Sequence, residues 1–207
     1  MIKKEYINIA NILTFSRIIL GLVFLALFLF QFEAEVFSGF ILKIISFFVF
    51  VIAIITDGLD GYFARKNDKV TDFGKHFDPL SDSIFFIIVF LTFVIINLMP
   101  VYFFIIIFFR EAFMHLFLRP YVKKKGSSLP ASIFGKIKTV CQSVFSLIIL
   151  FALILNDFLN YISKNISFLK NLIIQTSFVL FLIIALLSLF SLTTYLINLG
   201  KIIPKQK

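Results

Sequence analysis

Aspartates gather in one short segment of an otherwise apolar chain, and only Asp157 lies outside it. Asp57 and Asp60 are three residues apart, and Asp78 and Asp82 are four apart, so each pair would share one face of a helix. If the two helices meet, the four carboxylates converge, and such like charges cannot all stay ionised without cations. Carboxylate oxygens without histidine or thiolate at matching spacing suit Mg²⁺ or Mn²⁺. Four carboxylates could hold two such ions, and paired ions stabilise charge during phosphoryl transfer.

Small and basic residues between these aspartates fit a nucleotide. Gly61 and Gly74 lack side chains where a nucleotide could pass close to the backbone. Arg65 offers a planar fork for a phosphate group. We expect Gly74 to lie in a loop before the second pair of acids. Asp68 and Asp72 fall out of the helical register, and we interpret them as solvated loop charges.

The acids could instead be interfacial residues that nearby basic side chains neutralise. Against this, the pattern D-x2-D-G-x2-A-R-x8-G-x3-D-x3-D specifies eight residues at fixed spacing, and chance occurrence at about one in twenty per position is negligible. The pattern resembles the signature of the CDP-alcohol phosphatidyltransferases, six-helix membrane enzymes that displace CMP from a CDP-linked lipid with an alcohol. The resemblance implies that two divalent ions are held by Asp57, Asp60, Asp78 and Asp82, that Asp82 is the general base, and that the CDP-lipid is bound by Gly61, Arg65, Thr71 and Gly74.

Composition places these residues in a membrane. The 207 residues are 60% hydrophobic and include 31 phenylalanines, whereas a soluble domain is about 45–50% apolar. A membrane helix needs about 20 apolar residues, and six stretches qualify: 12–31, 38–65, 80–99, 101–122, 133–156 and 172–198. We therefore predict an all-α integral membrane protein with six transmembrane helices in a single domain, 1–207. Asp78 and Pro79 are expected to begin the third span as cap and first turn.

The net charge of +9 is distributed by side of the membrane rather than along a nucleic-acid surface. With six spans, one side holds Lys3, Lys4, a loop with Arg65, Lys66, Lys69 and Lys75, the segment RPYVKKKG, and the tail with Lys201, Lys205 and Lys207. Basic loops mark the cytoplasmic side. Both termini and the active site are thus predicted to face the cytoplasm, in a multi-pass protein of the cell (inner) membrane. The lipid bilayer is the expected partner, and nucleic acid is not.

Basic residues deep in the later spans suggest how an acceptor is bound. Arg110 and Glu111 lie well inside the hydrocarbon by length, where ionisable residues face a cavity or a partner. A structural ion pair with another helix stays open as an alternative. Lys136 and Lys138 lie at the mouth of the fifth span, and their spacing puts them on different helix faces, so we expect only one of them to point inward. A cationic pocket suits an acceptor that carries its own phosphate, so Arg110, Lys136 and Lys138 are candidate phosphate ligands.

Three flanking segments, NILTFSR, RE and GKIKT, resemble the bacterial family members that form phosphatidylglycerophosphate. The resemblance implies CDP-diacylglycerol and sn-glycerol 3-phosphate as substrates. Inositol phosphate, serine, choline and phosphatidylglycerol stay open as acceptors, and a homodimer stays open too. A cation transporter is the rival from another class, but transporters place their sites near the midplane within repeated halves, and the second half of this chain has no matching acids.

The remaining ionisable residues have simpler interpretations. Arg119 lies near the cytosolic end of its span and is expected to anchor the helix at the interface. His76 is expected in the loop beside the acids. His115 follows Glu111 by four residues, so a hydrogen bond along one helix face is expected.

Overall fold

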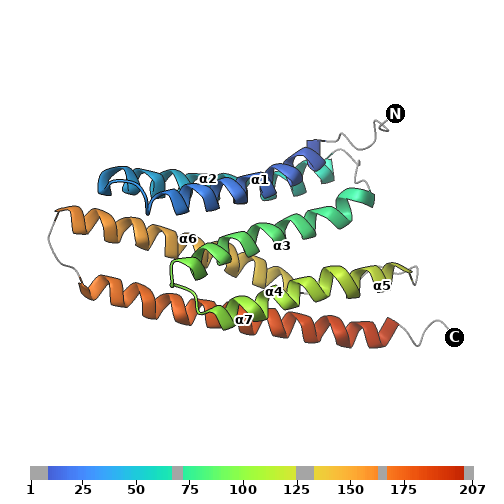
Figure 1. Cartoon of the computed structure of the whole chain (residues 1–207). Coiled ribbons are helices and arrows are strands. Elements are labelled where there is room, and N and C mark those ends of the chain that lie inside the picture. The colour runs from blue at the N-terminus through green and yellow to red at the C-terminus, as the bar shows by residue number, and fades with distance from the viewer. Residues whose placement is uncertain (1–8, 67–71, 125–132, 163–166, 203–207) are drawn as a thin grey trace.

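Long apolar helices make up the chain in the computed structural model (Figure 1). The structure describes the backbone of residues 9–66, 72–124, 133–162 and 167–202, and the side chains of 15–56, 77–122, 124, 133–162 and 168–200. The elements are α1 (Ile9–Phe30), α2 (Val36–Lys66), α3 (Asp72–Ile95), α4 (Val101–Phe113), the π-helix η2 (Met114–Leu118), α5 (Arg119–Lys124), α6 (Ile133–Ile162) and α7 (Ser167–Ile202). The part described contains no strand, as predicted for an all-α protein.

Five of the described segments are long and apolar enough to cross a membrane. They are Val36–Thr56, Phe77–Ile95, Val101–Val122, Ile133–Ile162 and Phe168–Gly200. The apolar part of α1 with described side chains, Phe15–Phe30, is shorter than a full span. The protein is therefore a helical membrane protein.

The start of α3 differs from the prediction. The helix begins at Asp72, so Pro79 lies inside it rather than in its first turn, and the expected cap at Asp78 is wrong. Gly74 and His76, expected in a loop, are likewise helical. The proline lacks only the N–H that would bond the carbonyl of residue 75, and neighbouring helices let membrane helices tolerate such a loss. The connection between α2 and α3 is correspondingly short, 67–71.

The predicted third span, 80–99, also ends too far along the chain. The helix stops at Ile95 because Asn97 adopts a left-handed backbone with φ of 57°. Asparagine tolerates this conformation and often ends a helix. The amides of Leu98 and Met99 both donate to the carbonyl of Phe93, at 2.9 and 3.0 Å. The chain then turns sharply into α4 at Pro100.

The fourth predicted span forms one continuous helix through α4, η2 and α5. Its π-helical turn, η2, lies near the end of the span that the sequence predicts to be cytosolic. Within it the amide of Arg119 donates to the carbonyl of Met114, five residues back. Pro120 follows and has no N–H to give to the carbonyl of residue 116. A π turn in an α-helix often accompanies a functional site, and this one carries His115.

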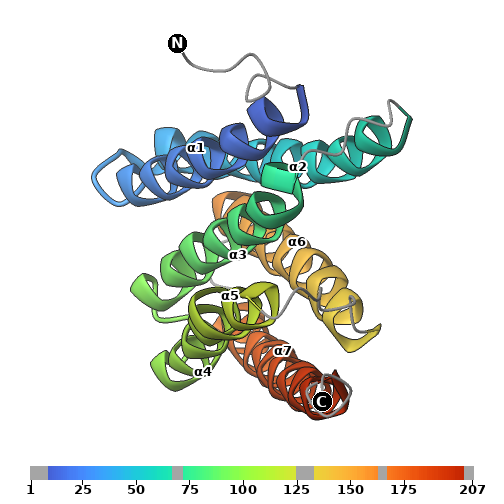
Figure 2. The same cartoon turned by 90° about the vertical axis from the view of Figure 1, so that its right-hand side faces the viewer.

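Phenylalanines pack the helices into layers (Figure 2), with α3 between the α1–α2 pair and α4. The ring of Phe50 on α2 stacks 5.6 Å from that of Phe85 on α3. Farther along α3, Phe93 packs 5.6 Å from Phe181 on α7. Gly21 lets α1 approach α3, because a Cβ there would lie 3.1 Å from the Phe85 ring.

Candidate active site

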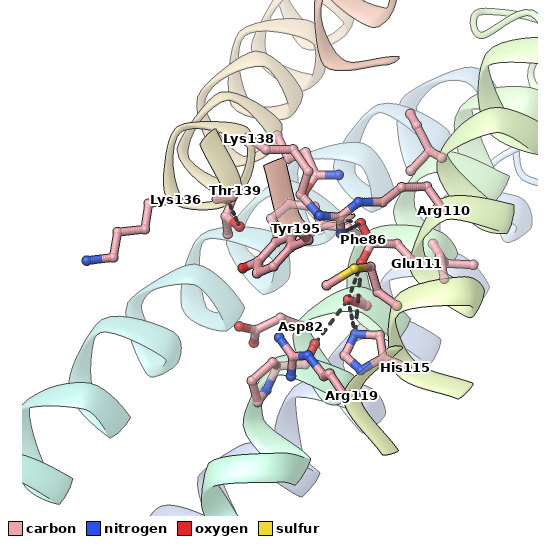
Figure 3. A pocket seen from close by; sticks show the side chains of 17 residues that line it. Asp82, Phe86, Arg110, Glu111, His115, Arg119, Lys136, Lys138, Thr139 and Tyr195 are labelled. Atoms are coloured by element: carbon pink, nitrogen blue, oxygen red, sulfur yellow. Dashed lines mark hydrogen bonds and ion pairs between the residues drawn. The ribbon is translucent and has the colours of Figure 1, made fainter. Parts of the chain in front are cut away.

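A polar cavity opens within the bundle, towards the end where α3 and α6 begin and α7 finishes. Its volume is about 300 Å³. Its walls come from α3, α4, η2, α5, α6 and α7, which brings together residues far apart in the sequence. The lining residues are Pro79, Asp82, Ser83, Phe86, Ile87, Ile107, Arg110, Glu111, Met114, His115, Arg119, Gly135, Lys136, Lys138, Thr139, Gln142 and Tyr195 (Figure 3).

Basic side chains outnumber acidic ones around this cavity. The ionisable lining residues, besides His115, are Arg110, Arg119, Lys136 and Lys138 against Asp82 and Glu111. The basic residues come from two separate helical segments that face α3. A cavity with such an excess of fixed positive charge concentrates anions.

Glu111 is the centre of the buried charge cluster. Its Oε1 accepts hydrogen bonds from Arg110 Nη1 at 2.9 Å and from Lys138 Nζ. All three side chains are almost fully buried, with exposed fractions of 3% for Glu111 and 6% for each cation. The predicted alternative of an ion pair with another helix is thus present, through Lys138 on α6. The same three residues line the cavity, so the ion pair forms part of the cavity wall.

Ser83 links the second oxygen of Glu111 to His115. Its hydroxyl donates to Glu111 Oε2 at 2.8 Å and lies 2.9 Å from His115 Nε2. A carboxylate only accepts and the hydroxyl has one hydrogen, so His115 Nε2 is the donor to Ser83. The predicted direct contact between His115 and Glu111 is 3.9 Å long, too long for a hydrogen bond. That prediction is wrong in detail, because Ser83 on the neighbouring helix bridges the two.

Arg110 is fixed on three sides. Besides its bond to Glu111, its Nη2 donates to Ser191 Oγ at 2.7 Å, and its guanidinium lies 6.0 Å from the Tyr195 ring centroid. Its Nε, also buried, has no hydrogen-bond partner among the described residues. A buried N–H at a cavity wall without a protein acceptor suits a ligand that brings one.

Asp82 lies on the opposite wall of the cavity from this cluster (Figure 3). Its Oδ1 accepts a hydrogen bond from Arg17 Nη1 on α1. Asp78 lies one turn earlier on α3, so the predicted shared helix face of this pair is confirmed by the helix. The side chains of Asp57, Asp60, Gly61, Arg65 and Gly74 lie outside the described residues, as does Thr71 altogether. The predicted metal and CDP sites therefore stay predictions.

The carboxylates with described side chains suit a hard cation by their chemistry. Asp78 and Asp82 offer oxygen ligands from one helix face, which is the donor type of Mg²⁺ and Mn²⁺. Among the side chains described, no three His, Cys, Asp or Glu lie together as a metal site would need. The other two predicted ligands, Asp57 and Asp60, are about one helical turn apart near the end of α2, which continues to Lys66.

One prediction about the basic residues has a definite outcome. Only one of the two lysines on α6 points inward, as expected: Lys138 is buried and Lys136 is exposed at the cavity mouth. Arg119 lines the cavity as well, directly after the π turn that shifts the helical register. Its expected role as an anchor at the membrane interface stays a prediction.

Sequence reasoning missed three contributors to the site. Arg17 carried a signal, because an ionisable residue inside an apolar span marks a functional position with a partner. Ser83 directly follows Asp82 and shares a helix face with Pro79 rather than with the acids, so spacing gave no signal. Tyr195 lies on a helix that is apolar on every side, and only the tertiary fold places it at the cavity.

Comparisons with known proteins agree with this architecture. Residues 7–190 match the family model described as CDP-alcohol phosphatidyltransferase. Proteins named CDP-diacylglycerol–glycerol-3-phosphate 3-phosphatidyltransferase are similar: one of Treponema pallidum is 43% identical over 49% of this chain and 46% of its own length. One of Bacillus subtilis is 35% identical over 66% of this chain and 73% of its own. One of Rickettsia felis is 34% identical over 69% and 74%.

Apolar helices around a charged cavity thus define a helical membrane protein with a polar site, and the family match specifies its class. The chain belongs to the CDP-alcohol phosphatidyltransferase family. It is an enzyme, a transferase of phospholipid biosynthesis. The alignment with the Treponema protein spans about half of that relative's length.

Proposed function

We propose that this enzyme transfers the phosphatidyl group of CDP-diacylglycerol to sn-glycerol 3-phosphate, which yields phosphatidylglycerophosphate and CMP. The observation that carries the proposal is the shared cavity: Asp82 lies on one wall, and the Arg110–Lys138 cluster lies on the other. An acceptor with a phosphate at one end and a hydroxyl at the other fits that arrangement. The names of the similar bacterial proteins support the same acceptor.

The cationic wall would bind the acceptor phosphate. Lys138 has two N–H groups beyond the one it gives to Glu111, and Arg110 has its buried Nε. Lys136 is exposed at the mouth, where its positive charge would attract an incoming anion. Charge-assisted hydrogen bonds of this type are stronger than neutral ones.

Asp82 would act as the general base. The 1-hydroxyl of the acceptor gives its proton to the Asp82 carboxylate while its oxygen attacks the phosphorus that carries diacylglycerol. The new O–P bond forms as the bond from that phosphorus to the CMP oxygen breaks, and CMP leaves with the electron pair. The proton thus moves directly from the acceptor hydroxyl to the Asp82 carboxylate.

The CDP part would lie between α2 and α3. We propose that Gly61, Arg65, Thr71 and Gly74 contact it, and that Asp57, Asp60, Asp78 and Asp82 hold two divalent cations. When bound, such ions neutralise the diphosphate and the charge on the leaving CMP. The support is the motif with its carboxylate chemistry, together with the helical pairing of Asp78 and Asp82 on α3.

We further propose six membrane spans, with α1 as the first, both termini in the cytoplasm and the site at the cytosolic face of the cell (inner) membrane. The first described turn of α1 and the last of α7 lie at the same end of the bundle (Figure 1), as an even number of spans requires. The cavity opens towards that end, and the distribution of basic residues along the sequence supports a cytosolic position for it. The acyl chains of the donor could then stay in the bilayer.

An acceptor panel tests the proposed function. Purified protein in detergent receives CDP-diacylglycerol, Mg²⁺ or Mn²⁺, and one of sn-glycerol 3-phosphate, inositol phosphate, serine, choline or phosphatidylglycerol. CMP release and a phosphatidylglycerophosphate mass are expected with glycerol 3-phosphate alone, and chelator should abolish both. Release with serine or choline and none with glycerol 3-phosphate would replace the acceptor, and full activity in excess chelator would remove the cations.

A further inference from the structure

Arg17 is a buried cation in the apolar first helix. Its side chain is 2% exposed, and it lies in the segment Phe15–Phe30, which has no other charged residue. An ionisable side chain in such a place is costly unless a partner or a function offsets it. None of the catalytic steps derived above uses Arg17.

Arg17 contacts the proposed base, Asp82. Arg17 Nη1 donates to Asp82 Oδ1 across the contact between α1 and α3, although the two residues are 65 positions apart. Asp82 is 27% exposed and also faces the polar cavity. Arg17 lines a separate, narrow space with Asp82, Phe85 and Ser143. Asp82 therefore borders both spaces, whereas Arg17 lines only the narrow one.

Tight packing fixes the helix that carries Arg17. The Phe15 ring lies 4.6 Å from that of Phe77 on α3. One turn after Arg17, Gly21 lets the two helices come so close that a Cβ would lie 3.1 Å from the Phe85 ring and 3.3 Å from Ile88. With α1 held at both points, the guanidinium has little freedom to move away from Asp82.

We propose that Arg17 is a positioning residue. It holds one oxygen of Asp82 so that the other oxygen stays turned to the reacting groups. Its positive charge also lowers the affinity of the Asp82 carboxylate for cations. The inference rests on the proposed role of Asp82. Orientation of a catalytic group matters because a displacement of about 1 Å can cost on the order of a hundredfold in rate. A planar guanidinium fixes a carboxylate better than an ammonium does.

The test compares Arg17→Gln and Arg17→Lys with a matched control. Lys43 on α2 forms another interhelical ion pair, with Asp157 on α6, and Lys43→Gln removes it outside the site. Three quantities are measured in detergent: kcat and KM for each substrate, the Kd for Mn²⁺ without substrate by electron paramagnetic resonance, and the melting temperature. The Mn²⁺ reading reports on Asp82 independently of turnover.

Arg17→Gln should lower kcat roughly ten- to a hundredfold and leave both KM values within about twofold. It should also bind Mn²⁺ roughly tenfold more tightly, because a positive charge next to the predicted ligand Asp82 is gone. Arg17→Lys keeps the charge, so its Kd for Mn²⁺ should stay at the wild-type value while kcat falls several-fold. Lys43→Gln should leave kcat, both KM values and the Kd for Mn²⁺ at their wild-type values.

Unchanged kcat and Mn²⁺ affinity in Arg17→Gln would overturn the proposal, as would losses no larger than those of Lys43→Gln. If Arg17→Gln does not fold, Arg17→Lys decides, and a wild-type kcat in that variant contradicts the positioning role. Failure of the proposed function looks different: the wild-type protein would then make no phosphatidylglycerophosphate, while the Mn²⁺ comparison between Arg17→Gln and wild type would still test the contact.

Discussion

Replacing Glu111 with leucine should unfold the protein at a much lower temperature. The carboxylate receives hydrogen bonds from Arg110, Lys138 and Ser83. Without it, two cations with 6% exposure each would face one another with no acid between them. Removing one partner of a buried ion pair costs about 3–5 kcal/mol. In a chain of this size, 1 kcal/mol shifts the melting temperature by about 2–4 °C, so a drop of roughly 6–20 °C follows.

The assay can use the single cysteine of the chain. Cys141 is only partly exposed in the folded protein, so a thiol-reactive fluorophore reports its exposure as purified protein in detergent is heated. The matched control is Lys43→Met, which breaks a pair whose side chains are 18% and 29% exposed. This pair is less buried than the Glu111 cluster, so that variant should lose less stability than Glu111→Leu does.

A double variant sharpens the result. Adding Lys138→Met to Glu111→Leu removes one of the two uncompensated cations, so part of the lost stability should return, with a coupling of about 0.5–3 kcal/mol. The reasoning would be refuted if Glu111→Leu melted as close to wild type as Lys43→Met does. A double variant less stable than Glu111→Leu alone would refute it as well.

Three further substitutions probe other parts of the structure. Asp82→Asn should reduce CMP release by about 10²–10⁴-fold because an amide cannot take the proton, while Asp157→Asn, outside the site, should keep wild-type turnover. Ser83→Ala should lower the free energy of unfolding by about 1.5–3 kcal/mol, since Glu111 loses a donor; a melting temperature equal to wild type would contradict this. Gly21→Leu should lower the free energy of unfolding by about 1–3 kcal/mol, because the larger side chain overpacks the contact with Phe85. An unchanged free energy of unfolding, measured by denaturation in detergent, would contradict this.

Periodicity and composition predicted much of this molecule. Apolar runs located the long helices, because a membrane span must hydrogen-bond its backbone groups internally and can expose apolar side chains to lipid. The two-residue spacing of Lys136 and Lys138 correctly predicted that one of them turns inward, since adjacent faces of a helix differ by a fixed rotation. The aspartate motif identified the family that the family model also assigns.

Local rules were insufficient where neighbouring helices decide the outcome. Pro79 reads as a helix start, but α3 extends back to Asp72 and keeps the proline inside. The π turn at Met114–Leu118 shifts the helical register just before Arg119, which lines the cavity. The contact between Arg17 and Asp82 spans 65 positions, and it depends on the close packing at Gly21. Such pairings follow from tertiary packing, which spacing along one helix cannot report.

The central claim is that the cationic wall of the cavity binds the phosphate of the acceptor. The most direct measurement is the KM for each substrate in Arg110→Ala, with Lys170→Ala, an exposed lysine near the start of α7, as control. Loss of charge-assisted hydrogen bonds worth about 1.5–3 kcal/mol should raise the KM for sn-glycerol 3-phosphate roughly ten- to a hundredfold. The KM for CDP-diacylglycerol should stay nearly constant. An unchanged KM for glycerol 3-phosphate, or an equal rise for both substrates, would contradict the claim.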